Sequence, residues 1–213
     1  MDHLTMQLDV RNVCLTYGDT PILNDTSFTL EPGEHALLLG ASGSGKSSLL
    51  NIICGLQTPL SGSVSLGGEP VGDAVRKAHM GVIFQTLRLV SALNVRANLM
   101  LAQKLANGSP DGAKVDATLD QLGIAHRASA RPFELSQGEA QRAAIARALV
   151  VSPKLLIADE PTSALDKGNT RIVAKMLIDA ARNAGASLLV ATHDDRLASH
   201  FARTLTLQDG KVT

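Results

Sequence analysis

The chain has 213 residues, of which 45% are hydrophobic, and its 20 Lys and Arg residues are matched by 20 Asp and Glu residues, so its formal net charge is zero. This length and apolar content suffice for the core of one domain or of closely joined subdomains. The balanced charge argues against a nucleic acid or an anionic lipid surface as the partner.

Targeting and membrane signals are missing from the sequence. The first residues, Met1 to Thr5, have neither the basic start nor the apolar stretch of a signal peptide, and nowhere do about eighteen apolar residues follow one another as a membrane span requires. We therefore expect a cytoplasmic chain, with any membrane-embedded part belonging to another polypeptide. Cys14 and Cys54 lack metal-ligand spacing, and we expect two buried thiols rather than a disulfide.

The beginning of the chain predicts antiparallel strands, because short segments of alternating apolar residues are separated by turn residues. The segments are 8–10, 13–15, 22–23 and 28–30, with turns at 18–19 and 31–34. A buried strand at 35–39 and a helix with an apolar face at 48–54 follow.

A glycine-rich loop lies between this strand and this helix: Gly40-Ala41-Ser42-Gly43-Ser44-Gly45-Lys46-Ser47. Its glycines allow backbone conformations in which several N–H groups point inward at phosphate oxygens, and the helix adds the positive end of its dipole. Lys46 can then reach the β- and γ-phosphates, and the Ser47 hydroxyl can bind the Mg²⁺ that bridges them. The alternative is a glycine-rich turn that binds nothing, which the strand-loop-helix context disfavours.

The rest of the chain alternates predicted strands and helices. An exposed strand at 63–66 precedes a turn at 67–68, and a helical region follows Thr86, with apolar residues at helical spacing before and after a break at 108–112. Continuous apolar runs at 155–158 and 188–191 are typical of strands covered on both faces. An amphipathic helix over 172–181 ends before Gly185, and residues 204–211 predict a closing hairpin.

Polar residues follow three of the predicted strands, and a parallel sheet would bring them to one edge beside the phosphate loop. These residues are Gln85, the pair Asp159-Glu160, and His193. Each taken alone is as readily a solvated or structural residue. Together, we expect Asp159 to hold Mg²⁺, through a water, and Glu160 to orient or deprotonate an attacking water.

Ser136-Gln137-Gly138-Glu139 has the spacing of a helix capping box, and a helix is expected to run from there through Leu149. Taken alone, this motif favours a structural cap.

The phosphate loop, the motif Leu135 to Glu139 and the acidic pair, in that order, resemble the ATP-binding cassette (ABC) ATPase family. The resemblance covers nearly the whole chain. It implies a single domain, 1–213, of the α/β class: a P-loop NTPase core with a parallel-rich sheet, an N-terminal antiparallel β subdomain and a helical subdomain at about 86–152.

The resemblance also assigns site residues. Ser48 joins the phosphate loop in binding ATP, Tyr17 stacks on adenine, Gln85 completes the Mg²⁺ shell, and His193 bonds the γ-phosphate or the attacking water. Ser136, Gly138 and Glu139 would bind the γ-phosphate held by the opposite subunit, with Gln137 and Glu139 standing where the family usually has Gly and often has Gln. Residues 161–166 match the loop that joins the two active sites across the dimer.

The implied function is ATP hydrolysis, with Lys46, Glu160 and His193 as catalytic residues, by a dimer of this chain that moves separate transmembrane permease subunits. The chain would then sit on the cytoplasmic face of the inner (plasma) membrane, without nucleic acid. The stretch from Gly81 to Val95 and the compact length look similar to lipoprotein-release and macrolide-export ATPases.

Other functions remain open at this stage. An importer ATPase, or a regulatory ATPase that acts on a membrane-bound effector without transport, would carry the same motifs. An ABC ATPase of DNA repair or translation would show coiled-coil insertions, zinc cysteines or tandem cassettes, none of which is present in this sequence. A phosphate-loop kinase or GTPase would not explain the motif at Leu135.

Overall fold

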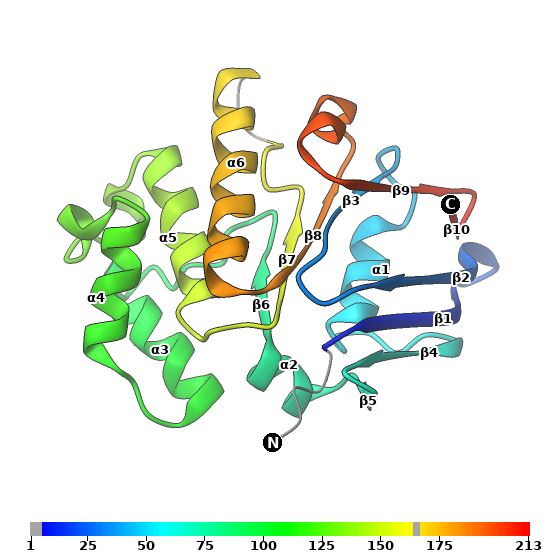
Figure 1. The fold of residues 1–213 in the computed structure, drawn as a ribbon, viewed down its shortest axis with the longest axis horizontal. Coiled ribbons are helices and arrows are strands. Elements are labelled where there is room, and N and C mark those ends of the chain that lie inside the picture. Colours follow the sequence, from blue (N-terminus) through cyan, green and yellow to red (C-terminus); the bar gives the residue numbers. More distant parts are fainter. Residues whose placement is uncertain (1–5, 164–166) are drawn as a thin grey trace.

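Two β-sheets and a cluster of helices build the computed structural model, which describes residues 6–163 and 167–213 (Figure 1). Within those residues, one sheet has the strand order β2-β1-β4-β5 and the other the order β10-β9-β3-β8-β7-β6. The first sheet contains β1 (Leu8–Tyr17), β2 (Thr20–Leu30), β4 (Ser61–Leu66) and β5 (Glu69–Pro70). The second contains β3 (His35–Leu39), β6 (Met80–Ile83), β7 (Leu155–Asp159), β8 (Ser187–Thr192), β9 (Arg203–Gln208) and β10 (Lys211–Val212).

The helices lie along both sheets and at one end of the molecule. They are α1 (Lys46–Ile53), α2 (Asp73–His79), α3 (Val95–Asn107), α4 (Gly112–Gln121), α5 (Gln137–Leu149) and α6 (Lys167–Ala184), with short 3₁₀ segments η1 (Ala125–Arg127), η2 (Pro132–Glu134) and η3 (Asp195–His200). In Figure 1, α3, α4 and α5 stand together at the end away from β1, β2 and β4. No helix in the described part of the chain has the length and apolarity that crossing a membrane needs.

The second sheet is parallel except at its β10 edge, and it is covered on both faces. β3 pairs with β8 and β9, and β7 pairs with β6 and β8, all in parallel. Leu38, Ile157 and Leu189 pack in the cluster that contains α1 and the antiparallel sheet, whereas Leu37 and Leu156 pack in the cluster that contains α3 to α6. The apolar runs predicted to be strands buried on both faces are therefore confirmed.

The antiparallel sheet differs in detail from the prediction. The predicted segments 8–10 and 13–15 form one strand, β1, with a register shift between Val10 and Val13. Asn12, at φ +49°, accommodates the irregularity, and its side chain donates a hydrogen bond to Asp25 across the pair. In the same way, 22–23 and 28–30 are parts of one strand, β2. The strand predicted at 63–66 is present as part of β4, but it is not exposed throughout, because Val64 and Leu66 are buried.

Two further expectations need correction. Cys14 and Cys54 are both free, but only Cys54 is fully buried. Cys14 lies between the buried Val13 and Leu15, and because side chains alternate along a strand it points the other way, toward the surface. Helix α1 begins at Lys46 and not at residue 48, so the last part of the phosphate loop already belongs to the helix.

Candidate active site

The phosphate loop joins β3 to α1 at the carboxyl edge of the parallel sheet. Gly45 adopts φ +100°, and a Cβ there would lie 2.9 Å from Ile22 Cγ2. A Cβ on Gly40 would lie 2.8 Å from the carbonyl oxygen of Leu207. Both positions therefore require glycine. Gly45 needs it for its backbone conformation and for the close approach of β2, and Gly40 needs it for the close approach of β9.

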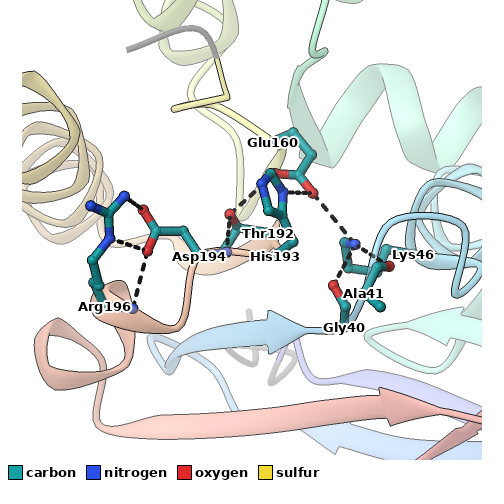
Figure 2. Close-up of polar contacts among 8 residues, drawn as sticks. All are labelled: Gly40, Ala41, Lys46, Glu160, Thr192, His193, Asp194 and Arg196. Atoms are coloured by element: carbon teal, nitrogen blue, oxygen red, sulfur yellow. Dashed lines mark hydrogen bonds and ion pairs between the residues drawn. The ribbon is translucent and has the colours of Figure 1, made fainter. Parts of the chain in front are cut away.

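Lys46 points back across the loop. Its Nζ donates hydrogen bonds to the carbonyl oxygens of Gly40, at 2.8 Å, and Ala41, at 3.0 Å, and lies 3.4 Å from Glu160 Oε1 (Figure 2). The Lys46 side chain is only 5% exposed. A buried ammonium group is stable here because two carbonyl groups and a carboxylate surround it.

Glu160 is held from several directions. It follows β7 with φ +46°, and its N–H donates to the carbonyl of Ala191 at 2.8 Å. The Thr192 hydroxyl donates to its Oε2 at 3.1 Å, and His193 Nδ1 lies 3.0 Å from both carboxylate oxygens (Figure 2). The backbone turn and these contacts together direct the carboxylate toward Lys46.

The loop that carries His193 is anchored by residues that sequence reasoning missed. Thr192 Oγ1 accepts a hydrogen bond from the Asp194 N–H while it donates to Glu160. Hydrogen bonds from Arg196 lower the pKa of the Asp194 carboxyl and fix that side chain (Figure 2). A threonine at a strand end directly before a histidine was the only available signal. His193 itself is 51% exposed, so its other ring nitrogen can meet a ligand.

Asp159 and Ser47 are neighbours at the carboxyl end of β7. Burial raises the pKa of the Asp159 carboxyl, against the lowering effect of a hydrogen bond with the Ser47 side chain. Asp159 Oδ1 is buried and has no hydrogen-bond partner among the described residues. A buried carboxylate oxygen without a partner, beside a hydroxyl, fits Mg²⁺, which prefers oxygen ligands and keeps several waters.

Most predicted site residues line one cavity of about 520 Å³, in agreement with their expected convergence. Its lining consists of Tyr17, Ile22, Ser42, Gly43, Gly45, Lys46, Ser47, Ser48, Gln85, Glu160 and His193. Ile22 was not predicted, since an apolar residue in a strand carries no signal for a site. Gly40, Ala41 and Ser44 line a neighbouring groove beside β9.

Tyr17 stands at the mouth of this cavity. It is 53% exposed, and its hydroxyl lies 3.3 Å from Ser48 Oγ and donates to Gln57 Oε1 at 3.1 Å. These hydrogen bonds lower the pKa of Tyr17. They tie the side chain to α1 and to the residues after it, and leave the ring accessible to a planar ligand.

The motif at the start of α5 lies apart from the cavity. Ser136 Oγ accepts a hydrogen bond from the Glu139 N–H at 3.4 Å, and the Glu139 carboxylate accepts one from the Ser136 N–H at 2.8 Å, so the predicted capping box is confirmed. Ser136, Gly138 and Glu139 are not among the residues that line the cavity. Of the loop expected at 161–166, residues 164–166 lie outside the described part of the chain.

Comparisons with known proteins agree with this geometry. A family model described as ABC transporter matches residues 23–163. The chain is 41% identical over 218 residues to the lipoprotein-releasing system ATP-binding protein LolD of Geobacter metallireducens, covering 96% of this chain and 97% of that protein. It is 40% identical over 200 residues to an uncharacterised ABC transporter ATP-binding protein, Rv0986, of Mycobacterium tuberculosis, covering 90% of this chain and 81% of that protein.

Solved structures resemble the fold closely. The dimeric ATP-binding cassette MJ0796, in a post-hydrolysis state with ADP and Pi, matches with a TM-score of 0.85 and 30% identity over 96% of both chains. The cbiO1 protein of Clostridium perfringens, part of the ABC transporter complex cbiONQ, matches with a TM-score of 0.86 and 28% identity over 98% of this chain and 87% of that one.

Proposed function

We propose a lipoprotein-release function for this chain, which belongs to the ABC transporter family and is an ATPase subunit of a transporter. Two copies would hydrolyse MgATP between them and so drive the release or export of lipoproteins through separate membrane subunits. Similarity to LolD over nearly the full length of both chains supports the cargo class. The dimeric state of the related MJ0796 cassette supports the pairing of two copies. The proposal places the chain at the cytoplasmic face of the inner membrane.

The observation that carries the proposed chemistry is the contact of Glu160 with both Lys46 and His193 inside one cavity. Lys46 would neutralise the β- and γ-phosphates, and Glu160 would orient or deprotonate the attacking water, a role worth about 10²–10⁴-fold in rate. His193 would hold the γ-phosphate or that water. Thr192 positions Glu160 for this role, because its hydroxyl fixes one carboxylate oxygen.

Mg²⁺ would be held by Ser47 and Gln85, and through a water by Asp159. When bound, it would neutralise charge on the phosphates. The buried unpartnered oxygen of Asp159 supports this assignment.

The second copy completes the site. Ser136 and Gly138 lie away from the cavity of their own chain, at the N-terminal end of α5, where the helix dipole favours an anion. We assign them to the γ-phosphate held by the facing copy, so that bound ATP joins the two copies and hydrolysis lets them separate.

A groove beside Gln85 suits the membrane subunits. It has a volume of about 330 Å³, and its lining includes the exposed side chains of Leu56, Val90 and Leu105, the last 65% exposed. Arg147 also lines it, and within the described residues no carboxylate pairs with this guanidinium, which donates instead to the carbonyls of Val82 and Arg88. An amphipathic segment with an acidic residue, supplied by a membrane subunit, matches this combination.

The test combines two variants. Glu160→Gln should lower ATP hydrolysis about 10²–10⁴-fold yet keep ATP binding and accumulate dimers in size-exclusion chromatography. Lys46→Ala should weaken ATP binding itself. Glu69→Gln, at an exposed position in β5, serves as the control and should behave like the parent. If Glu160→Gln hydrolyses ATP at the parental rate, the assignment of the base is wrong.

The transport part needs its own measurement. Copurification from membranes should recover permease subunits with the chain, and reconstitution with them should show ATP-dependent release of a lipoprotein. Recovery of an importer permease, or of an effector that moves no cargo, would overturn the proposed cargo class while leaving the ATPase assignment in place.

A further inference from the structure

The hydroxyl proton of Ser136 is already used within its own chain. Ser136 Oγ lies 2.9 Å from Glu139 Oε2, and because an ionised carboxylate only accepts hydrogen bonds, the hydroxyl is the donor. Ser136 Oγ also accepts a hydrogen bond from the Glu139 N–H. A phosphate oxygen is also an acceptor, so a γ-phosphate facing Ser136 needs the same hydroxyl proton that now forms the hydrogen bond to Glu139.

Arg127 places a positive charge beside that carboxylate. Its Nε lies 3.2 Å from Glu139 Oε1 without forming a hydrogen bond, so this contact is an ion pair, and another guanidinium nitrogen donates to the carbonyl oxygen of Glu134. Arg127 therefore bridges the residues on either side of the segment 135–138. His126 Nε2 lies 3.5 Å from the same carboxylate oxygen and adds positive charge when protonated.

Glu139 is ionised at neutral pH. Hydrogen bonds from the Ser136 N–H and hydroxyl, with the charge of Arg127, lower the pKa of this carboxyl. A full negative charge therefore stands beside the hydroxyl that has to face a phosphate.

We propose that Glu139 competes with the ATP of the facing copy for the Ser136 hydroxyl, and that Arg127 is the positioning residue that sets the strength of this competition. The inference rests on the proposed function, in which two copies share each ATP. When the copies close, Ser136 turns its O–H from Glu139 to the γ-phosphate. The carboxylate keeps the Ser136 N–H and the nearby charge of Arg127, and its remaining charge repels the phosphate, which is the opposite of the phosphate-binding role expected for Glu139 from the resemblance. Glu139 thus raises the ATP concentration needed for closure and favours reopening.

The experiment measures dimer formation against ATP concentration, by light scattering, in the Glu160→Gln chain so that ATP persists. Glu139→Gln keeps an oxygen that accepts the Ser136 N–H but removes the charge, and should lower the half-maximal ATP concentration about 3- to 10-fold. Arg127→Gln leaves the Glu139 charge without its counter-charge and should therefore raise the half-maximal ATP concentration by a similar factor when Glu139 is present. When residue 139 is already Gln, the same substitution should change that concentration less than about two-fold. Arg127→Lys keeps the charge and should stay near the parent.

The comparison of the two backgrounds separates this role from a structural one. The bond from Arg127 to the Glu134 carbonyl is lost in both backgrounds, so a purely structural effect of Arg127→Gln would be equal in the two. Equal effects, or an ATP requirement unchanged or raised by Glu139→Gln, would overturn the proposal while the Glu160→Gln chain still dimerises with ATP. If that chain never dimerises, the proposed function fails first. If Arg127→Gln does not fold, Glu139→Gln alone decides the outcome.

Discussion

Gly81 stands where the parallel sheet closely approaches a helix of the cluster at its end. It lies in β6, and a Cβ on this residue would stand 2.3 Å from the carbonyl oxygen of Ala148 in α5 and 3.1 Å from Leu156 Cδ1. The first distance is far shorter than any real carbon–oxygen contact, and the carbonyl is backbone. Gly81→Ala can therefore be accommodated only if β6 or α5 moves.

The cost follows from what holds those elements. β6 is paired in parallel with β7, and α5 is buried along the face that includes Ala144, Ile145 and Ala148. Overpacking of this kind costs about 1–3 kcal/mol, and a backbone obstacle places it at the upper end. For a chain of this size, about 3 kcal/mol corresponds to a melting temperature lower by roughly 6–12 °C. ATPase activity should fall too, since β6 leads into Gln85 and α5 begins after Ser136.

The assay is thermal unfolding followed by circular dichroism, without nucleotide. Gly138→Ala, in α5 itself, is the control, because a Cβ there meets no heavy atom within 4 Å. It should leave the melting temperature unchanged or raise it slightly, since alanine favours a helix over glycine by about 1 kcal/mol. Equal melting of Gly81→Ala and the parent would refute the reasoning, because α5 would then not be held against β6.

Two further predictions concern side chains outside this contact. Burial raises the pKa of Cys54 to about 12, so about one molecule in ten thousand carries its thiolate at pH 8. A thiol reagent should therefore modify only Cys14 until the chain is denatured, as counted by mass spectrometry. Rapid labelling of Cys54 in the native chain would contradict its burial. Tyr17→Ala should weaken ATP binding about 5- to 150-fold if stacking is worth ~1–3 kcal/mol, measured by calorimetry. Tyr17→Phe loses only the bonds to Ser48 and Gln57 and should stay within a few-fold of the parent, and equal losses in both variants would exclude stacking.

Local patterns were sufficient for much of the fold and of the site. The continuous apolar runs at 155–158 and 188–191 identified the central strands, because a strand covered on both faces has no polar side to display. A parallel sheet then places Gln85, Glu160 and His193 at one edge, and all three line one cavity with the phosphate loop. Convergence of this kind follows from topology and can be anticipated without coordinates.

The parts that could not be predicted depend on contacts between distant residues. The union of 8–10 and 13–15 into one strand depends on Asn12 meeting Asp25, a pairing that alternation of apolar residues does not reveal. The contact of Arg127 with Glu139 joins a 3₁₀ turn to a helix start, and although Glu139 belongs to a recognisable motif, nothing in the sequence around Arg127 marks it as the partner. Thr192 shows the same limit, because its role depends on the side chain of Glu160.

The ion pair of Lys46 and Glu160 gives the pocket an internal counter-ion. A triphosphate that binds here meets an ammonium group whose charge is already balanced, so it replaces the Glu160 carboxylate as the partner of Lys46. The displaced carboxylate stays tethered to Thr192 and His193, within reach of solvent drawn in around the terminal phosphoryl group. Under the proposed function, loading the pocket and releasing the Glu160 carboxylate are one and the same exchange.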